Sequence, residues 1–180
     1  MAGSYITKRA LAESLKRLME NEPLSKISIQ EICDGCHLCR KSFYYHFEDK
    51  YALVNYIFDT EFIDVAKNTV YGDQWEFIEH LYKYFYENRT FYRRVLKSES
   101  RNTFFDHFRH LLQPALKEKL YAIFGPEVSE FHMLFYTDAI TGTLERWLLD
   151  KEPMHYADFI KLLRSLIDKG AESVCRKMNT

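Results

Sequence analysis

The sequence predicts an all-α protein with a small N-terminal head and a larger helical body. Only six Gly and four Pro occur among 180 residues, and they fall mostly between segments of helical periodicity. Apolar residues make up 47% of the chain, which is enough for a sizeable core. A chain of this length can form either one domain or a small head on a larger body. We expect the head to span residues 1–50 and the body, which would carry effector sensing and dimerisation, to span 51–180.

Helical periodicity and breaking residues predict nine helices. Pro23, Gly72 and the Gly125-Pro126 pair separate periodic segments. Pro114 instead lies inside a helical pattern, so we expect a kink or a break near His110. The expected helices span residues 5–21, 28–36, 40–47, 50–70, 74–87, 89–97, 101–123, 127–150 and 155–176.

The segment from Ser28 to Lys50 has room for two short helices and a tight turn, the layout of a helix-turn-helix. Ser28 followed by Glu31 is a capping box, which predicts a helix start. The second helix should bury Phe43 and Phe47, four residues apart on one face. Its outward face is then polar and aromatic, a composition suited to phosphates and base edges of double-stranded DNA. That face consists of Arg40, Lys41, Ser42, Tyr44, Tyr45 and His46.

These residues resemble the recognition motif of the tetracycline-repressor (TetR) family of bacterial one-component transcription regulators. The run from Arg40 to Phe47, followed by Lys50, is similar to the family's recognition helix and its continuation. His37 stands where the family has a turn Gly, and Cys39 replaces its usual Ser cap. Both changes weaken the local turn chemistry, because Gly tolerates positive φ and Ser caps a helix better than Cys.

A looser similarity in residues 51–58, 87–92 and 146–149 is to the TetR branch that includes regulators of dihydroxyacetone kinase operons. The resemblance implies a regulator, with repression favoured over activation, that binds a near-palindromic operator as a homodimer. Because the sequence has neither a signal-peptide pattern nor a membrane span, we expect the protein to be cytoplasmic. It also implies an unidentified small-molecule or protein effector. We expect base-edge contacts from Arg40, Lys41, Ser42 and Tyr45. We expect phosphate contacts from Ser28, Tyr44, His46 and Lys50.

The charge distribution permits DNA binding without demanding it. Residues 1–50 carry eight basic and seven acidic side chains, a net charge of plus one, and the whole chain carries −1. A helix-turn-helix dimer needs few phosphate contacts per subunit, and hydroxyl, imidazole and helix-terminus donors supply several without charge. The first twenty residues lack a signal-peptide pattern, and no apolar run approaches the roughly 18 residues of a membrane span.

The last two expected helices predict an interface between subunits. In 127–150, Phe131, Phe135 and Asp138 share one face, whereas Leu144 and Trp147 lie on the opposite face, so both sides favour burial. We expect an intermolecular four-helix bundle in a two-fold homodimer; a thick monomeric core is the alternative. The last helix adds an apolar stripe made of Tyr156, Phe159, Ile160, Leu163, Leu166, Ile167 and Val174.

Asp138 interrupts an otherwise apolar face, where a carboxylate is costly unless a partner compensates its burial. One explanation is a hydrogen bond or ion pair, for example with Arg146 or across the dimer. The other is an effector pocket that Asp138 orients and aromatic side chains enclose. The candidate wall residues are Tyr82, Tyr86, Phe105 and Phe108.

Three cysteines spaced as Cys-x-x-Cys-x-x-Cys raise the alternative of a metal or redox site. Cys33 to His37 also spells the c-type haem attachment signature, which needs an exported chain. A metal site needs a fourth ligand, which would have to be His37 or the distant Cys175. We expect Cys33 and Cys36 to be small packed side chains, Cys39 to be reduced, and no cofactor or metal; a thiol redox or metal switch is the alternative.

Enzyme motifs are incomplete. Asp106, His107 and His110 could share a helical face as metal ligands, and Glu152 with His155 forms one pair of the di-iron type, but each is half a site. The sequence has no Gly-rich phosphate loop and no nucleophile elbow. We therefore expect no enzyme activity. The alternative functions are a helical metalloenzyme and a protein-binding adaptor that has lost DNA recognition.

Overall fold

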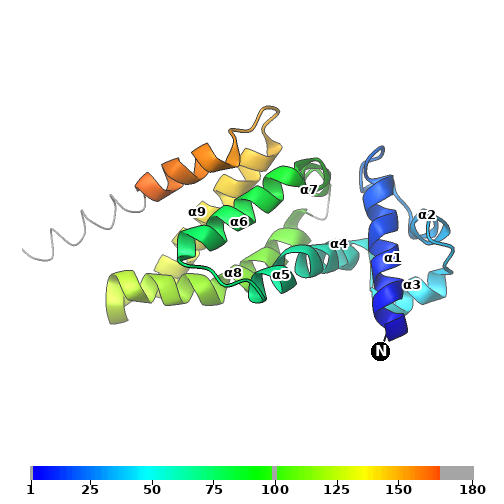
Figure 1. The fold of residues 1–180 in the computed structure, drawn as a ribbon, viewed down its shortest axis with the longest axis horizontal. Coiled ribbons are helices and arrows are strands. Elements are labelled where there is room, and N and C mark those ends of the chain that lie inside the picture. Colours follow the sequence, from blue (N-terminus) through cyan, green and yellow to red (C-terminus); the bar gives the residue numbers. More distant parts are fainter. Residues whose placement is uncertain (1, 99–100, 167–180) are drawn as a thin grey trace, which may run out of the picture. The chain divides into compact units, whose positions relative to one another are not determined.

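A computed structural model describes residues 2–98 and 101–166, and every regular element in these segments is helical (Figure 1). The prediction of an all-α fold is confirmed. No helix of the described segments is long and apolar enough to cross a membrane. The α-helices are α1 (Ala2–Leu18), α2 (Ile29–Asp34), α3 (Arg40–His46), α4 (Lys50–Phe58), α5 (Asp64–Lys67), α6 (Gln74–Glu87), α7 (Arg89–Leu96), α8 (Arg101–Phe124), α9 (Glu130–Leu149) and a further helix over residues 156–166.

The chain divides into two compact units. Unit 1 comprises Met1–Thr69 and Asn88–His107, and unit 2 comprises Val70–Glu87 and Phe108–Thr180. Helix α8 therefore contributes its first residues to unit 1 and the rest to unit 2. Each unit is built from two separate stretches of sequence, so neither is a simple N-terminal or C-terminal segment.

The core of unit 1 forms where α1 packs against α2, α3 and α4. One side of α1 is apolar and buried, and it meets apolar side chains from each of the three other helices. Full burial of an aliphatic or aromatic side chain contributes about 1.5 to 3 kcal/mol, so this layer stabilises unit 1. Fully buried members are Leu11, Leu15, Ile32, Phe43 and Leu53.

Residues 50–67 form one continuous helix with a π-helical turn, Asp59–Ile63, between α4 and α5. The Thr60 hydroxyl donates to the carbonyl oxygen of Tyr56 at 2.8 Å. Asp59 Oδ1 lies 2.7 Å from His107 Nε2 on α8, and Glu61 Oε1 accepts from Lys16 Nζ on α1 at 2.7 Å. The π turn thus presents two carboxylates, two residues apart, to two different helices. Single-turn π segments of this kind are frequent at functional sites.

Helix α8 runs from Arg101 to Phe124 without interruption, so the expected break near His110 is wrong. Pro114 removes one backbone N–H donor, which leaves the His110 carbonyl without its helical partner. Both residues are exposed. Water can therefore hydrate that carbonyl, and the rest of the helix keeps its hydrogen bonds.

An aromatic cluster joins three helices in unit 2. The rings of Tyr82 from α6, Trp147 from α9 and Phe159 from the last helix lie with centroids 5.1 to 5.4 Å apart. Trp147 Nε1 also donates to the carbonyl oxygen of Met154 at 2.8 Å, which closes the connection between α9 and the last helix. Aromatic pairs at such distances contribute about 0.5 to 1.5 kcal/mol beyond their buried area.

Helix α9 has one packed face and one open face. Thr141, Leu144 and Trp147 are buried, whereas Phe131 is 71% and Phe135 58% exposed. The described subunit therefore covers only one of the two apolar sides that the sequence indicated. In the last helix Ile160 is buried and Leu163 half-buried, while Leu162 and Leu166 are exposed. The predicted stripe is thus buried or half-buried through Leu163 but exposed at Leu166, and Ile167 and Val174 lie outside the described residues.

Helices α1 and α2 approach closely at Ser14 and Gly35. The buried Ser14 hydroxyl donates to the carbonyl oxygen of Ile32 at 2.7 Å. A Cβ atom added at Gly35 would lie 2.3 Å from Ser14 Oγ. Because Gly35 has an ordinary helical φ of −63°, this position needs glycine for space and not for backbone freedom.

Gly35→Ala should lower the free energy of unfolding by about 1 to 3 kcal/mol, because its methyl group overlaps Ser14 Oγ. Ser14→Ala removes that oxygen and leaves the new methyl 3.5 Å from the Ser14 Cβ, an ordinary contact. The double variant should therefore lose less free energy of unfolding than the two single variants lose together. Urea denaturation measures these losses. Strict additivity would contradict the proposed overlap.

The turn between α2 and α3 has its left-handed residue at His37, with φ of 57°. His37→Gly should leave the free energy of unfolding unchanged or raise it by up to about 1 kcal/mol, because Gly adopts positive φ without steric cost. His37→Val should lower it by more than about 1 kcal/mol, because a β-branched residue is strained there. His37 is exposed, so the comparison involves little lost packing. Urea denaturation of the two variants checks this, and equal stabilities would argue against backbone strain.

Candidate nucleic-acid interface

Helix α2 begins with the capping box that the sequence indicated. The backbone N–H and the hydroxyl of Ser28 both donate to Glu31 Oε2, at 2.7 and 2.6 Å, and the Glu31 N–H donates to Ser28 Oγ at 3.2 Å. These hydrogen bonds from Ser28 hold the pKa of Glu31 below its ordinary value, so the carboxylate is ionised at neutral pH. Both donors of Ser28 are therefore directed at an anion of the protein itself.

Helix α3 buries Phe43 and Phe47, as predicted, and this packing orients the whole helix. Their rings lie 5.8 Å apart, and Phe47 also contacts Tyr56 of α4 at 5.3 Å. The helix begins after Cys39, whose side chain makes no capping hydrogen bond to the backbone. The start of α3 is thus held by tertiary packing more than by its cap.

The outward side of α3 carries the polar and aromatic cluster that the sequence predicted. Tyr45 is 82% exposed, and Arg40, Lys41 and Tyr44 are exposed as well. Arg40 Nη2 donates to the Tyr44 hydroxyl at 3.3 Å, and its guanidinium carbon lies 5.9 Å from the Tyr44 ring centroid. These contacts hold the Arg40 side chain along the helix surface.

The two remaining α3 candidates are half-buried. Ser42 Oγ lies 3.3 Å from Cys39 Sγ, and the His46 ring meets the Tyr45 ring edge-on at 4.8 Å. Both side chains therefore have partners on their own helix, beside the exposed group. The structure brings all six α3 candidates together on one short helix.

Lys50, unlike the α3 surface group, binds backbone carbonyl oxygens of the protein. Its ammonium donates to the carbonyl oxygens of Leu24, Ser25 and Ile27, at 2.7, 3.3 and 2.7 Å. A lysine ammonium has three N–H donors, and these carbonyls accept three hydrogen bonds. Lys50 therefore closes the segment between α1 and α2, and the phosphate contact expected from the sequence stays a prediction.

The cysteines follow their predicted packing. Cys33 is fully buried and Cys36 half-buried, with its Sγ 3.3 Å from the Ile32 carbonyl oxygen. Burial raises the pKa of both thiols, which disfavours the reactive thiolate. Cys39 is exposed, and its hydrogen bonds with Ser42 lower its pKa. Within the described residues, no three or more His, Cys, Asp or Glu side chains are grouped to hold a metal ion.

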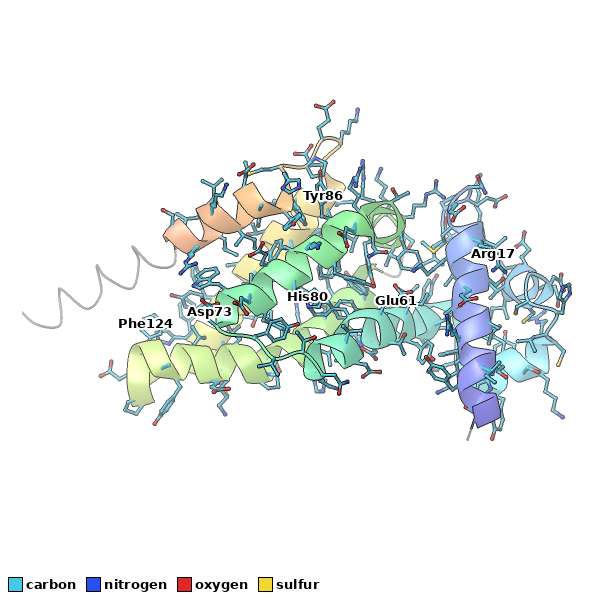
Figure 2. The ribbon with its side chains drawn as sticks, in the orientation of Figure 1. Arg17, Glu61, Asp73, His80, Tyr86 and Phe124 are labelled. Atoms are coloured by element: carbon cyan, nitrogen blue, oxygen red, sulfur yellow. The ribbon has the colours of Figure 1, made fainter. Side chains whose placement is uncertain are left out.

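The pocket expected from the candidate effector residues stays a prediction, and their described surroundings differ. Tyr82 lies inside the aromatic cluster, where burial raises its pKa and its hydroxyl has no hydrogen-bond partner in the described part of the chain. Tyr86 lies at the edge of that cluster, 6.0 Å from Trp147 (Figure 2). Phe108 is buried in unit 2, whereas Phe105 is buried in unit 1.

Asp138 is exposed on the open face of α9. The expectation of a costly buried carboxylate is therefore wrong for the described subunit, because the apolar residues beside it on the helix also face outward. The sequence shows which residues share this face. It does not show whether the subunit covers that face.

The comparisons with known proteins agree with this architecture. Residues 73–169, more than half of the chain, match the TetR_C_8 family, described as the transcriptional regulator C-terminal region. The HTH-type dhaKLM operon transcriptional activator DhaS of Lactococcus lactis subsp. lactis (strain IL1403) is 29% identical over 135 residues, which cover 73% of this chain and 69% of the relative.

Two solved structures share the fold. A TetR transcriptional regulator from Streptococcus agalactiae 2603V superposes with a TM-score of 0.70 at 23% identity, covering 92% of this chain and 96% of that one. The dihydroxyacetone kinase operon activator DhaS gives a TM-score of 0.62 at 21% identity, covering 91% and 97%. The family model matches more than half of the chain, and a helix-turn-helix lies near the N-terminus of the chain. We conclude that the chain belongs to the TetR family of transcriptional regulators.

Proposed function

We propose that the protein regulates transcription by binding a near-palindromic operator with helix α3 in the DNA major groove. The observation that carries this proposal is the exposed group on α3, which Phe43 and Phe47 turn away from the core. Guanidinium, ammonium, hydroxyl and phenol groups on one helix supply donors for base edges. The proposal assigns base-edge contacts to Arg40, Lys41, Ser42 and Tyr45.

Phosphate contacts are proposed for Tyr44 and His46. We leave out Ser28, because its donors serve the Glu31 carboxylate, which repels a phosphate. We leave out Lys50, because three carbonyl oxygens accept from its ammonium. The interface then uses mainly uncharged donors besides Arg40 and Lys41, which suits a head with a net charge near zero.

We propose a two-fold homodimer through the open face of α9 and the outer side of the last helix. Exposed Phe131, Leu134 and Phe135 on α9, with Leu162 and Leu166 on the last helix, support it. Exposed apolar side chains clustered in this way mark interaction surfaces, and a four-helix bundle from two subunits would bury them. Such a dimer would place two α3 helices at half-sites about 34 to 36 Å apart, or at a small multiple of that spacing.

We propose that an effector, a small molecule or a protein, acts through unit 2. It would control binding only through its different affinity for DNA-competent and DNA-incompetent states, and a full switch needs about 5.5 kcal/mol of that difference. As the direction of control we propose activation in place of the repression expected from the sequence, because the L. lactis relative is named an activator. A promoter fusion assayed with and without the protein tests this direction.

Arg40→Ala and Tyr45→Ala should each weaken binding to the operator by about 1 to 3 kcal/mol and relax its sequence preference, because each removes a base contact. Operator fragments come from genomic pull-down and sequencing, and fluorescence anisotropy at fixed salt measures the affinity. Lys83→Ala, an exposed lysine of unit 2, is the matched control and should leave affinity unchanged. A wild-type protein without preference for any genomic fragment at moderate salt would instead support an adaptor that has lost DNA recognition.

Phe135→Glu and Leu162→Glu should each convert the dimer to a monomer at micromolar concentration, because each places a charge in the proposed bundle. Light scattering measures the mass. Val70→Glu is the control, since Val70 is 95% exposed but lies outside this surface, and it should remain dimeric. Leu163→Glu is a poorer test, because Leu163 is half-buried in its own subunit. A monomeric wild type would exclude the proposed dimer.

A further inference from the structure

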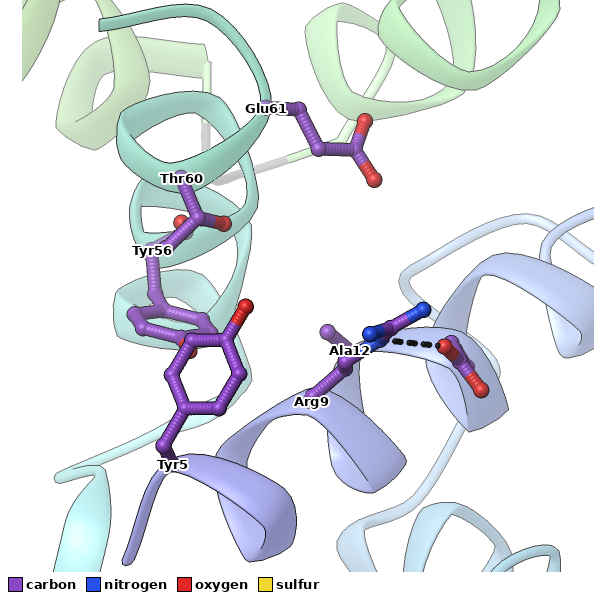
Figure 3. Close-up of a pocket in the computed structure, with 7 residues that line it drawn as sticks. Tyr5, Arg9, Ala12, Tyr56, Thr60 and Glu61 are labelled. Carbon is purple, nitrogen blue, oxygen red and sulfur yellow. Dashed lines mark hydrogen bonds and ion pairs between the residues drawn. The ribbon is translucent and has the colours of Figure 1, made fainter. Parts of the chain in front are cut away.

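A hollow of about 240 Å³ lies in unit 1 between α1 and the helix of residues 50–67 (Figure 3). Helix α1 contributes Tyr5, Arg9 and Glu13, and the other helix contributes Tyr56, Thr60 and Glu61, the last two from the π turn. The irregular part of that helix therefore lines the hollow, and the lining residues do not include the α3 surface group.

The lining favours a positively charged ligand. Its two carboxylates are each paired with a basic side chain, Glu13 with Arg9 at 2.9 Å and Glu61 with Lys16 at 2.7 Å. A cationic ligand can therefore bind a carboxylate by exchanging with one of these side chains. Tyr5 and Tyr56 add two aromatic rings, whose faces attract cations. Burial raises the pKa of Tyr56, so its phenol stays neutral.

The volume sets the size of the ligand. At about 30 Å³ per water in the liquid, the hollow corresponds to roughly eight water molecules, which is below the range for drug-sized ligands. We propose that it binds a small organic ammonium ion. The ammonium faces the Glu61 carboxylate, and the carbon atoms contact the rings of Tyr5 and Tyr56.

The ligand competes with Lys16. Glu61 Oε1 accepts from Lys16 Nζ at 2.7 Å, and both side chains are 35% exposed, so a second cation can reach the carboxylate from solvent. Occupancy weakens the link between the π turn and α1. Because α1 supplies the buried face against which α2 and α3 pack, the bound ion changes operator affinity. This site goes beyond the proposed function, which places the effector in unit 2.

Benzylammonium is a suitable probe, with benzyl alcohol as its neutral isostere, titrated calorimetrically into the full chain at pH 7. Benzylammonium should bind about tenfold more tightly than the alcohol, the size expected of a cation against two rings and a carboxylate. Glu61→Gln should weaken its binding about tenfold, whereas Lys16→Met, which removes the competitor, should tighten it several-fold. Glu48→Gln, an exposed carboxylate outside the hollow, is the matched control and should change nothing.

If Glu61 binds the ligand, Glu61→Gln should weaken benzylammonium binding and Lys16→Met should tighten it. If the pair is only structural, losing either partner should change the affinity in the same direction. Circular dichroism checks the fold, and Lys16→Met keeps the carboxylate, so it tests the proposal even if Glu61→Gln does not fold. Equal affinities for benzylammonium and benzyl alcohol, or no tightening in Lys16→Met, would overturn the site. Specific operator binding without ammonium binding would refute this site alone, whereas ammonium binding without operator preference would refute only the proposed function.

Discussion

Burial of Phe43 and Phe47 beside α1 and α4 is the constraint on which the proposed DNA-binding surface depends. Successive side chains of an α-helix point about 100° apart, so fixing one face inward determines which residues face outward. Phe43 is fully buried and Phe47 nearly so, and Tyr45 on the other side is 82% exposed. If this packing were lost, the six polar and aromatic residues of α3 would no longer share a defined orientation.

The loops of the head are held by long basic side chains that donate to backbone carbonyl oxygens. Lys50 binds three carbonyls between α1 and α2, Arg94 of α7 donates to those of Met19 and Glu22, and Arg17 donates to that of Gly35 at 2.8 Å. These cations therefore stabilise the scaffold. The logarithm of a DNA-binding constant falls against the logarithm of the salt concentration with a slope of roughly 0.9 per phosphate neutralised. Because these cations bind carbonyl oxygens of the protein, we expect this slope to be shallow.

One face of α9 packs within the chain, and the other face is exposed. Leu144 and Trp147 hold α9 to α6 and the last helix within the subunit, whereas Phe131 and Phe135 remain exposed. An exposed apolar surface of this kind is unfavourable in water, and the proposed homodimer would cover it. Within one chain the Asp138 carboxylate is exposed to solvent and needs no partner, whereas in the proposed homodimer it would lie on the contacting face.

Local interactions explain what could be predicted from sequence. The helices, the Ser28–Glu31 capping box and the outward group on α3 depend on contacts within three or four residues, and the structure has them close to where periodicity and caps put them. The positive φ at His37 was likewise indicated by the residue that replaces Gly in the motif.

Contacts between residues far apart in the sequence determined the features that local patterns do not predict. The Lys50 tether, the overlap that excludes a side chain at Gly35, and the π turn with its Lys16 and His107 partners join helices that no local pattern pairs. The sequence by itself therefore determined the helices and the residues that share each face. Only the tertiary structure decided which faces are covered and which charged groups are already bound, because burial and pairing depend on how distant segments pack.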